Sequence, residues 1–232
     1  MNFVKNYLEE LKLRLDKLDP GRVEKIVDVL INAWKNDRQI FIIGNGGSAA
    51  IASHLACDLG KGTLKKIHDI SEKRFRVSSL TDNTPLLTAL ANDVAYENVF
   101  AQQLYNCIGM GDILIAITGS GNSENILKAL RVAQDKKAIT VAFLGSDGGK
   151  AKNLSDYYII YEDVHYGRIE DSHSILSHLI CCWIREKIDN LKGGGRYFKE
   201  DAGREKQKKT IFLDRDGVIN KNAAEHDYIK TL

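Results

Sequence analysis

Two glycine-rich turns in the chain have the composition of a phosphate-binding site. The first, Gly44-Asn-Gly-Gly-Ser48, follows the apolar run 40–43, and the second, Thr118-Gly-Ser-Gly-Asn-Ser123, follows the apolar run 113–117. Glycine lets the backbone turn tightly and approach a ligand, and the serine and threonine hydroxyls add hydrogen-bond donors. A helix that begins directly after such a turn offers free N–H groups and the positive end of its dipole. Both turns therefore predict binding of a phosphate group.

Other interpretations of these turns are less favoured. The pattern Gly44-x-Gly46-x-x-Ala49 formally satisfies a dinucleotide fingerprint. However, no carboxylate clearly ends the next strand, and a pyrophosphate does not need the hydroxyls of the second turn. Segment 145–150 ends in a lysine, but Ala151 stands where a P-loop has serine or threonine. Ordinary helix caps are a further alternative. We favour a phosphate monoester as the ligand.

Histidines and carboxylates recur at helical spacing in two segments. His54 and Asp58 are four residues apart, so they project from one helix face. Taken alone, this pair fits a surface ion pair better than a site. A later segment carries Glu170, His173 and His178, with the first and last a little over two turns apart. If the two helices face each other, they supply two imidazoles and two carboxylates, which suit a divalent metal or acid–base catalysis. Spacing alone does not show that they face each other.

Short apolar strands alternate with helices along the chain. Strands are predicted at 39–43, 74–80, 112–118, 138–144 and 157–161. Helices are predicted near 3–18, 22–36, 48–59, 86–92, 97–108, 123–135, 148–154 and 168–191. This alternation is typical of a parallel sheet covered on both faces. The expected fold class is therefore α/β, a three-layer sandwich with a central parallel sheet and an additional N-terminal pair of helices.

Composition excludes several classes of protein. Of the 232 residues, 44% are hydrophobic and 28% are charged, which excludes disorder, collagen and coiled coil as descriptions of the whole chain. The formal net charge is only +2, so we expect neither a nucleic-acid nor a membrane partner. The apolar runs are too short to span a bilayer, and the mixed-charge N-terminus does not resemble a signal peptide. The 4 cysteines form no CxxC pair. We therefore expect a reduced, cytoplasmic protein.

The composition changes after a first domain of residues 1–192. Residues 193–208 are glycine-rich and then charged, without apolar periodicity, and are interpreted as a linker. Residues 209–232 begin with one apolar strand that ends in two aspartates, and the sequence contains no neighbouring strand to pair with it. We therefore expect residues from about 193 onward to be flexible or loosely docked.

Residues 1–192 resemble the phosphoheptose isomerases, a family of sugar isomerase domain proteins. The resemblance rests on the two turns, on Asn92-Asp93, and on the two histidine-bearing segments, which occur in the same order. It implies conversion of sedoheptulose 7-phosphate into D-glycero-D-manno-heptose 7-phosphate, in heptose precursor biosynthesis. It also implies a homotetramer and one zinc ion per subunit.

The resemblance assigns roles to individual residues. The hydroxyl positions that hold the substrate phosphate are Ser48, Thr118, Ser120 and Ser123, and the glycines Gly46, Gly47 and Gly119 are further substrate-binding positions. The positions that contact the sugar are Asn45 and Asp93. The catalytic acid–base pair is Asp58 and His178, and the metal ligands are His54, Asp58, Glu170 and His178.

Two of these positions depart from the family pattern. Asp58 stands where the family usually has a glutamate, which shortens the carboxylate by one methylene and moves it by about 1 Å, a displacement that matters for proton transfer. Glu170 stands where the family has a glutamine, which adds a negative charge. Because of these departures, the identity of the phosphosugar stays open. The identities of the metal and of the base are open as well.

The segment 212–220, Phe-Leu-Asp-Arg-Asp-Gly-Val-Ile-Asn, resembles the first motif of haloacid-dehalogenase-type phosphatases, in the heptose bisphosphate phosphatase branch. The resemblance implies that Asp214 is a phosphoryl-accepting nucleophile and that Asp216 is its general acid/base. The later lysine and acidic motifs of those enzymes are missing from this sequence. We therefore expect this fragment to have no phosphatase activity.

The expected reaction is an aldose–ketose isomerisation through an enediol, with Asp58 and His178 moving protons and a metal polarising the oxygens. Two alternatives stay open. One is a non-catalytic phosphosugar sensor or scaffold protein of the same fold, and the other is an isomerase of a different phosphosugar. Non-catalytic relatives lack the acidic and histidine residues on the two helices, which favours an enzyme here.

Overall fold

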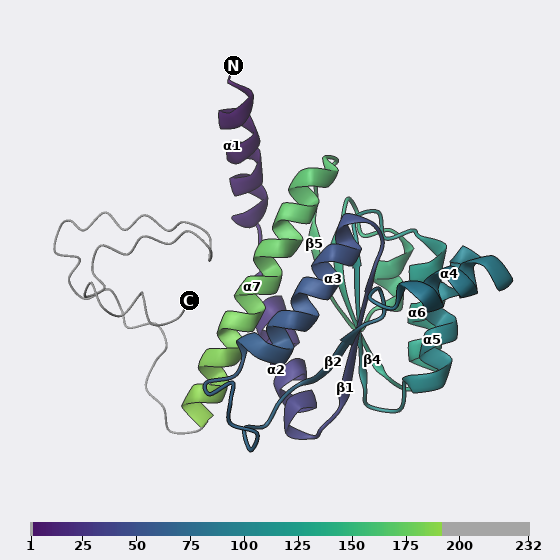
Figure 1. Cartoon of the computed structure of the whole chain (residues 1–232). Coiled ribbons are helices and arrows are strands. Elements are labelled where there is room, and N and C mark those ends of the chain that lie inside the picture. Colours follow the sequence, from purple (N-terminus) through teal and green to yellow (C-terminus); the bar gives the residue numbers. More distant parts are fainter. Residues whose placement is uncertain (1, 192–232) are drawn as a thin grey trace, which may run out of the picture. The chain divides into compact units, whose positions relative to one another are not determined.

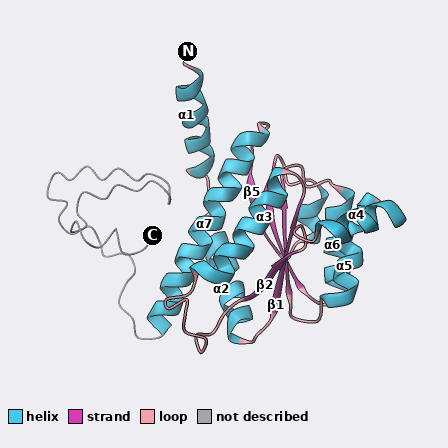
Figure 2. Ribbon diagram, viewed as in Figure 1, coloured by secondary structure: helices cyan, strands magenta, loops and turns pink. Residues whose placement is uncertain are grey.

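A parallel sheet of five strands runs through the centre of the computed structural model, which describes residues 2–191 (Figure 1, Figure 2). The strands are β1 (Gln39–Gly44), β2 (Arg76–Ser79), β3 (Ile113–Thr118), β4 (Ile139–Gly145) and β5 (Tyr157–Tyr161), in the spatial order β2-β1-β3-β4-β5. Every neighbouring pair is parallel. The central strands are buried along almost their whole length, as continuous runs of isoleucine, leucine, valine and alanine predict.

Helices cover both faces of this sheet, so the predicted three-layer α/β sandwich is confirmed. Helices α2 (Pro20–Lys35), α3 (Gly47–Cys57) and α7 (Tyr166–Leu191) pack on one face and share one hydrophobic core. Helices α5 (Val99–Cys107) and α6 (Glu124–Asp135) share a second core on the other face. Two further helices, α1 (Phe3–Leu15) and α4 (Thr84–Asp93), bury none of their residues.

Several element boundaries differ from the sequence-based predictions. The strand predicted at 74–80 is limited to β2, which is paired along one edge only. The helix predicted at 48–59 ends at Cys57, and one π-helical turn, Asp58–Gly62, follows it. Helix α4 begins earlier than predicted because the Asn83 side chain accepts a hydrogen bond from Leu86 N and Pro85 fits the first turn. The segments Tyr96–Asn98 and Lys150–Leu154 are 3₁₀-helices.

The strand order creates a topological switch point at the carboxyl edge of the sheet. Gly44, which ends β1, is in register with Ile117, one residue before the end of the neighbouring strand β3. After β1 the chain turns into α3 on one face, whereas after β3 it turns into α6 on the other. Ligands of open α/β sheets bind where neighbouring connections part in this way. The two glycine-rich turns therefore lie on either side of this switch point.

Helices α3 and α7 lie side by side on the same face of the sheet (Figure 1). Each follows the carboxyl end of a parallel strand, so both run in the same direction. Their contact is made by small and aliphatic side chains, among them Ala52, Leu55 and Ile180. Residues at matching heights on the two helices are thereby brought opposite each other.

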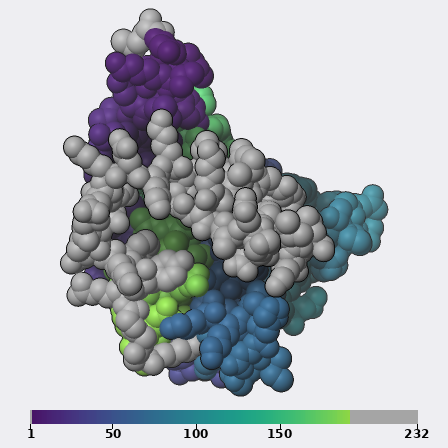
Figure 3. Space-filling view, turned by 60° about the vertical axis from the view of Figure 1, so that its left-hand side comes forward, coloured from purple at the N-terminus to yellow at the C-terminus, as the bar shows by residue number. Residues whose placement is uncertain are grey.

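Helix α1, coloured purple, projects from the described part of the molecule (Figure 3), and none of its residues is buried. Phe3 is 76% exposed, Val4 61% and Leu8 58%. No helix of the described residues has the length and apolar character needed to cross a bilayer. The predicted linker 193–208 and the phosphatase-like fragment 209–232, with Asp214 and Asp216, lie outside the described residues, so the division at residue 192 stays a prediction.

An ion pair between buried Asp163 and the largely buried Arg168 ties the first turn of α7 to the preceding connection. The Asp163 carboxylate accepts hydrogen bonds from Arg168 Nε at 2.6 Å and Nη2 at 2.7 Å, and from the backbone N–H of His165 at 2.9 Å. The Arg168 hydrogen bonds, with that backbone N–H, lower the pKa of Asp163 from 3.8 to about 2. This stabilisation is complete above the unfolded pKa near 4 and is lost as the pH falls through about 2.

We expect Asp163→Ala to lower the free energy of unfolding by about 3–5 kcal/mol at pH 7, because it leaves Arg168 buried without its partner. Urea unfolding measures the change. The matched control is Glu124→Gln, which removes an exposed ion pair with Arg131 and should cost about 0–1 kcal/mol. Between pH 4 and 2, the free energy of unfolding should fall further in the wild type than in Asp163→Ala, because only the wild type has the Asp163 carboxylate to protonate. Equal losses of unfolding free energy in Asp163→Ala and Glu124→Gln at pH 7 would contradict this role of Asp163.

Candidate active site

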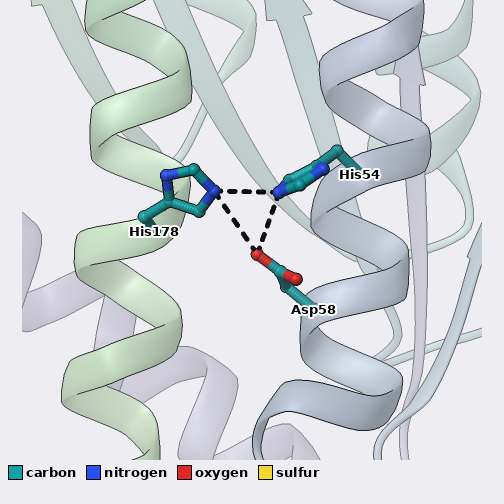
Figure 4. A group of neighbouring side chains, drawn as sticks. All are labelled: His54, Asp58 and His178. Atoms are coloured by element: carbon teal, nitrogen blue, oxygen red, sulfur yellow. Dashed lines mark hydrogen bonds and ion pairs between the residues drawn. The ribbon is translucent and has the colours of Figure 1, made fainter. Parts of the chain in front are cut away.

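Three side chains from α3, its π-helical extension and α7 converge in one cluster (Figure 4). His54 Nε2 lies 2.8 Å from His178 Nε2. Asp58 Oδ2 lies 3.2 Å from His54 Nε2 and 3.8 Å from His178 Nε2. The side chains of both histidines are 56% exposed and that of Asp58 is 29% exposed. The cluster is therefore open to a ligand on one side.

The helix pair explains why these residues meet. The backbone N–H of Asp58 still bonds to His54 O, so the helical i,i+4 spacing of the pair persists into the π-helical turn. On α7, His178 lies opposite His54, and the two rings meet nearly edge to face with centroids 4.9 Å apart. The sequence left open whether the two helices face each other, and the structure shows that they do.

The cluster fits a divalent metal. One ligand atom from each residue lies within 4.8 Å of the others, so a single ion can reach all three. Two imidazole nitrogens and one carboxylate oxygen form a donor set typical of catalytic zinc sites, which keep a further position open for substrate. The residues that would hold the ion are His54, Asp58 and His178.

Glu170, the fourth predicted ligand, lies elsewhere on the helix pair. A Cβ atom added to Gly47 would be 2.4 Å from Glu170 Oε1, so the carboxylate rests on the backbone at the start of α3. His54 is seven residues further along α3 and His178 is eight residues further along α7, which places the cluster about 11 Å away along the helix axes. Among the described residues, Glu170 is not part of the metal-binding group.

His173 is not part of the site either. Its side chain is fully buried between Phe143 and Tyr161, with ring centroids 6.4 and 6.0 Å away. Burial lowers its pKa to about 4, so the ring is neutral at neutral pH. Five residues along a helix correspond to about 140° around its axis, which is why His173 faces the core while His178 faces α3.

The second turn is held together by its own hydroxyl groups. Thr118 Oγ1 accepts a hydrogen bond from Gly121 N at 3.2 Å, and Ser120 Oγ accepts one from Asn122 N at 3.2 Å. A Cβ at Gly121 would lie 2.1 Å from Gly148 O, so only glycine fits there. Ser123 is the N-cap of α6, yet its hydroxyl makes no capping hydrogen bond. The Ser123 hydroxyl is therefore available to a ligand.

The first turn is held by side chains that the sequence did not single out. Asn45 exchanges two hydrogen bonds with Asn125, which lies in the first turn of α6, and accepts a third from Tyr96. The serine of this turn, Ser48, is 5% exposed. A Cβ at Gly44 would lie 2.5 Å from Ser48 O, which explains the glycine at the end of β1. Neither Asn125 nor Tyr96 belongs to a local motif that would have marked it.

Asp93, predicted to contact the sugar, is the last residue of α4 and is exposed. Its Oδ1 accepts a hydrogen bond from Asn92 Nδ2 at 2.8 Å. Asp93 is three residues from Tyr96, which hydrogen-bonds to Asn45, but in the described part of the chain no hydrogen bond or ion pair joins Asp93 to the other site residues. Its role in substrate binding stays a prediction.

The fold and the two turns define a sugar isomerase, or SIS, domain, and the SIS domain model matches residues 4–145. The chain is 35% identical to the phosphoheptose isomerase of Aquifex aeolicus over 77% of its length and 91% of that protein. It is 40% identical to the phosphoheptose isomerase of Helicobacter pylori strain P12, over 75% of this chain and 87% of that one. The chain belongs to the phosphoheptose isomerase family.

A solved structure agrees with this assignment. The phosphoheptose isomerase of Neisseria gonorrhoeae superposes with a TM-score of 0.70 at 28% sequence identity, over 78% of this chain and 94% of that chain. The expected family and its fold are therefore confirmed for the first part of the chain.

We expect His178→Gln to weaken zinc binding at least about tenfold, because it removes one of three ligands from the cluster. Isothermal titration of the metal-free protein with zinc measures the change. The control is His68→Gln, which alters an exposed histidine outside the cluster and should leave the affinity unchanged. Zinc binding that is equally tight in both variants would place the metal elsewhere.

Proposed function

We propose that this chain interconverts sedoheptulose 7-phosphate and D-glycero-D-manno-heptose 7-phosphate, as an aldose–ketose isomerase of heptose precursor biosynthesis. The observation that carries the proposal is the His54–Asp58–His178 cluster, set on the helix that follows the first turn, in a member of the phosphoheptose isomerase family. A non-catalytic sensor has no need for an open cluster of two imidazoles and a carboxylate, which argues against that alternative.

The cluster supplies the groups that an enediol mechanism needs. Such an isomerisation removes a proton from the carbon next to the carbonyl and returns one to the neighbouring carbon, while protons also move between the two oxygens. The Asp58 carboxylate is the proposed base for the carbon-bound proton. His178 is the proposed donor and acceptor at oxygen, a role that its Nε2 fills only while that nitrogen does not hold the metal.

Zinc is the proposed metal, held by His54, Asp58 and His178. When bound, it would act as a Lewis acid that polarises the carbonyl and hydroxyl oxygens of the sugar. Glu170, about two helical turns away, would face the middle of the substrate or its phosphate end. Its negative charge against the start of α3 disfavours a phosphate at that helix N-terminus, so the turn Thr118–Ser123 is the proposed phosphate site.

One experiment tests the function directly. The purified chain is incubated with sedoheptulose 7-phosphate, with and without zinc, and heptose 7-phosphate formation is followed by NMR. The proposal expects conversion that depends on zinc and that Asp58→Asn abolishes. Binding of the phosphosugar without conversion under any metal condition would support the sensor alternative instead.

Ser120→Ala should raise the KM for the phosphosugar while the fold survives. A hydroxyl that donates to a charged phosphate contributes about 1–3 kcal/mol, which corresponds to a roughly fivefold to hundredfold change. Steady-state kinetics measure it, and Ser71→Ala, an exposed serine distant in sequence from both turns, is the control. An unchanged KM in Ser120→Ala would exclude the second turn as the phosphate site.

The proposed assembly is a homo-oligomer, a tetramer by resemblance, in which the site draws residues from more than one subunit. Exposed Phe3, Val4 and Leu8 on α1 form an apolar strip that association would cover. We expect sedimentation to show an oligomer that Leu8→Glu weakens, with isomerase activity falling in parallel. A fully active monomer would contradict this assembly.

All four cysteines are free thiols, in keeping with the proposed cytoplasmic location.

A further inference from the structure

Three side chains from different segments form a polar network at the first turn. Asn45 Nδ2 donates to Asn125 Oδ1 at 2.9 Å, and Asn125 Nδ2 donates back to Asn45 Oδ1 at 2.8 Å. Asn45 Oδ1 also accepts from the hydroxyl of Tyr96 at 3.0 Å. Asn125 is 2% exposed, whereas Tyr96 is 59% exposed. The network joins the turn after β1 to the helix that follows the second turn.

The backbone fixes the direction of every hydrogen bond in this network. Ile126 N lies 3.0 Å from Asn125 Oδ1 and also 3.0 Å from its second acceptor, Ser123 O. Because a backbone N–H can only donate, an NH₂ group in place of Asn125 Oδ1 would set donor against donor, so this atom is the oxygen. The Asn45 atom that faces this oxygen must then be its NH₂ group. Asn45 Oδ1 in turn faces the NH₂ group of Asn125, and the Tyr96 hydroxyl must donate its proton to that oxygen.

This arrangement limits what Asn45 can offer to a ligand. Its carbonyl oxygen has two lone pairs, and both are used by Asn125 and Tyr96. Its NH₂ group has two protons, and one is used by Asn125. The remaining capacity is a single N–H, so Asn45 meets a ligand as a hydrogen-bond donor and the ligand atom must be an acceptor.

We propose that Tyr96 is a positioning residue for the sugar. With Asn125 as the buried anchor, its hydroxyl holds the Asn45 amide in the one orientation that directs an N–H to an oxygen of the phosphosugar, other than the phosphate. Without the Tyr96 hydroxyl, Asn45 Oδ1 regains a free lone pair and its amide is less firmly held. The inference rests on the proposed function, because it specifies how that site recognises its substrate.

The test compares Tyr96→Phe with Tyr105→Phe. Each substitution removes only a hydroxyl from an exposed tyrosine, and Tyr105 lies on α5, outside the network. Calorimetric titration of the full chain measures the Kd for sedoheptulose 7-phosphate and, separately, for inorganic phosphate. We expect Tyr96→Phe to raise the Kd for the phosphosugar about threefold to tenfold, with an unchanged Kd for phosphate and an unchanged thermal midpoint. Tyr105→Phe should change neither of the two Kd values nor the thermal midpoint.

A double-mutant cycle with Asn45→Ala shows whether Tyr96 acts through Asn45. We expect Tyr96→Phe to have no further effect on the phosphosugar Kd once Asn45 is alanine. Additive effects, an unchanged Kd in Tyr96→Phe, or an equal rise in the Kd for phosphate would each overturn the inference. The titration detects binding without turnover. A wild-type chain that binds the phosphosugar but does not isomerise it would therefore refute the proposed function and not this inference.

Discussion

The packing of α3 against α7 is the contact on which the rest of the site depends. Both helices follow strands of a parallel sheet and lie on the same face, so they run in the same direction and keep one register along their contact. That register places Glu170 at Gly47 and, two turns further, His178 at His54. The Asp163–Arg168 pair ties the first turn of α7 to the connection that precedes it.

The strand order supplies the second half of the site. Because β1 and β3 are neighbours whose following helices cover opposite faces, the two glycine-rich turns flank one switch point at the carboxyl edge of the sheet. The first turn is tied to α6 through the hydrogen bonds between Asn45 and Asn125. The proposed function assigns the substrate phosphate and the reacting carbons to different elements of this arrangement.

Much of this arrangement follows from the sequence. The alternation of strands and helices predicted the three layers of the fold. The turn Thr118–Ser123 could be recognised because its hydroxyl-bearing residues and glycines are adjacent in the sequence. Two kinds of feature could not be predicted from the sequence. His173 and His178 look alike as residues, and only the packing of α7 shows that one faces the core and the other faces α3. The roles of Tyr96 and Asn125 arise from contacts across 51 and 80 positions of the chain, which no local spacing encodes.

The central claim is that the helix pair holds the reactive centre and the second turn holds the phosphate. A crystal structure of the chain grown with zinc and sedoheptulose 7-phosphate, with anomalous diffraction recorded at the zinc edge, tests both parts at once. The account predicts one anomalous peak about 2 Å from Nε2 of His54, Nε2 of His178 and a carboxylate oxygen of Asp58, with the phosphate at Thr118–Ser123. A peak away from this cluster, or a phosphate at the start of α3 beside Glu170, would contradict it.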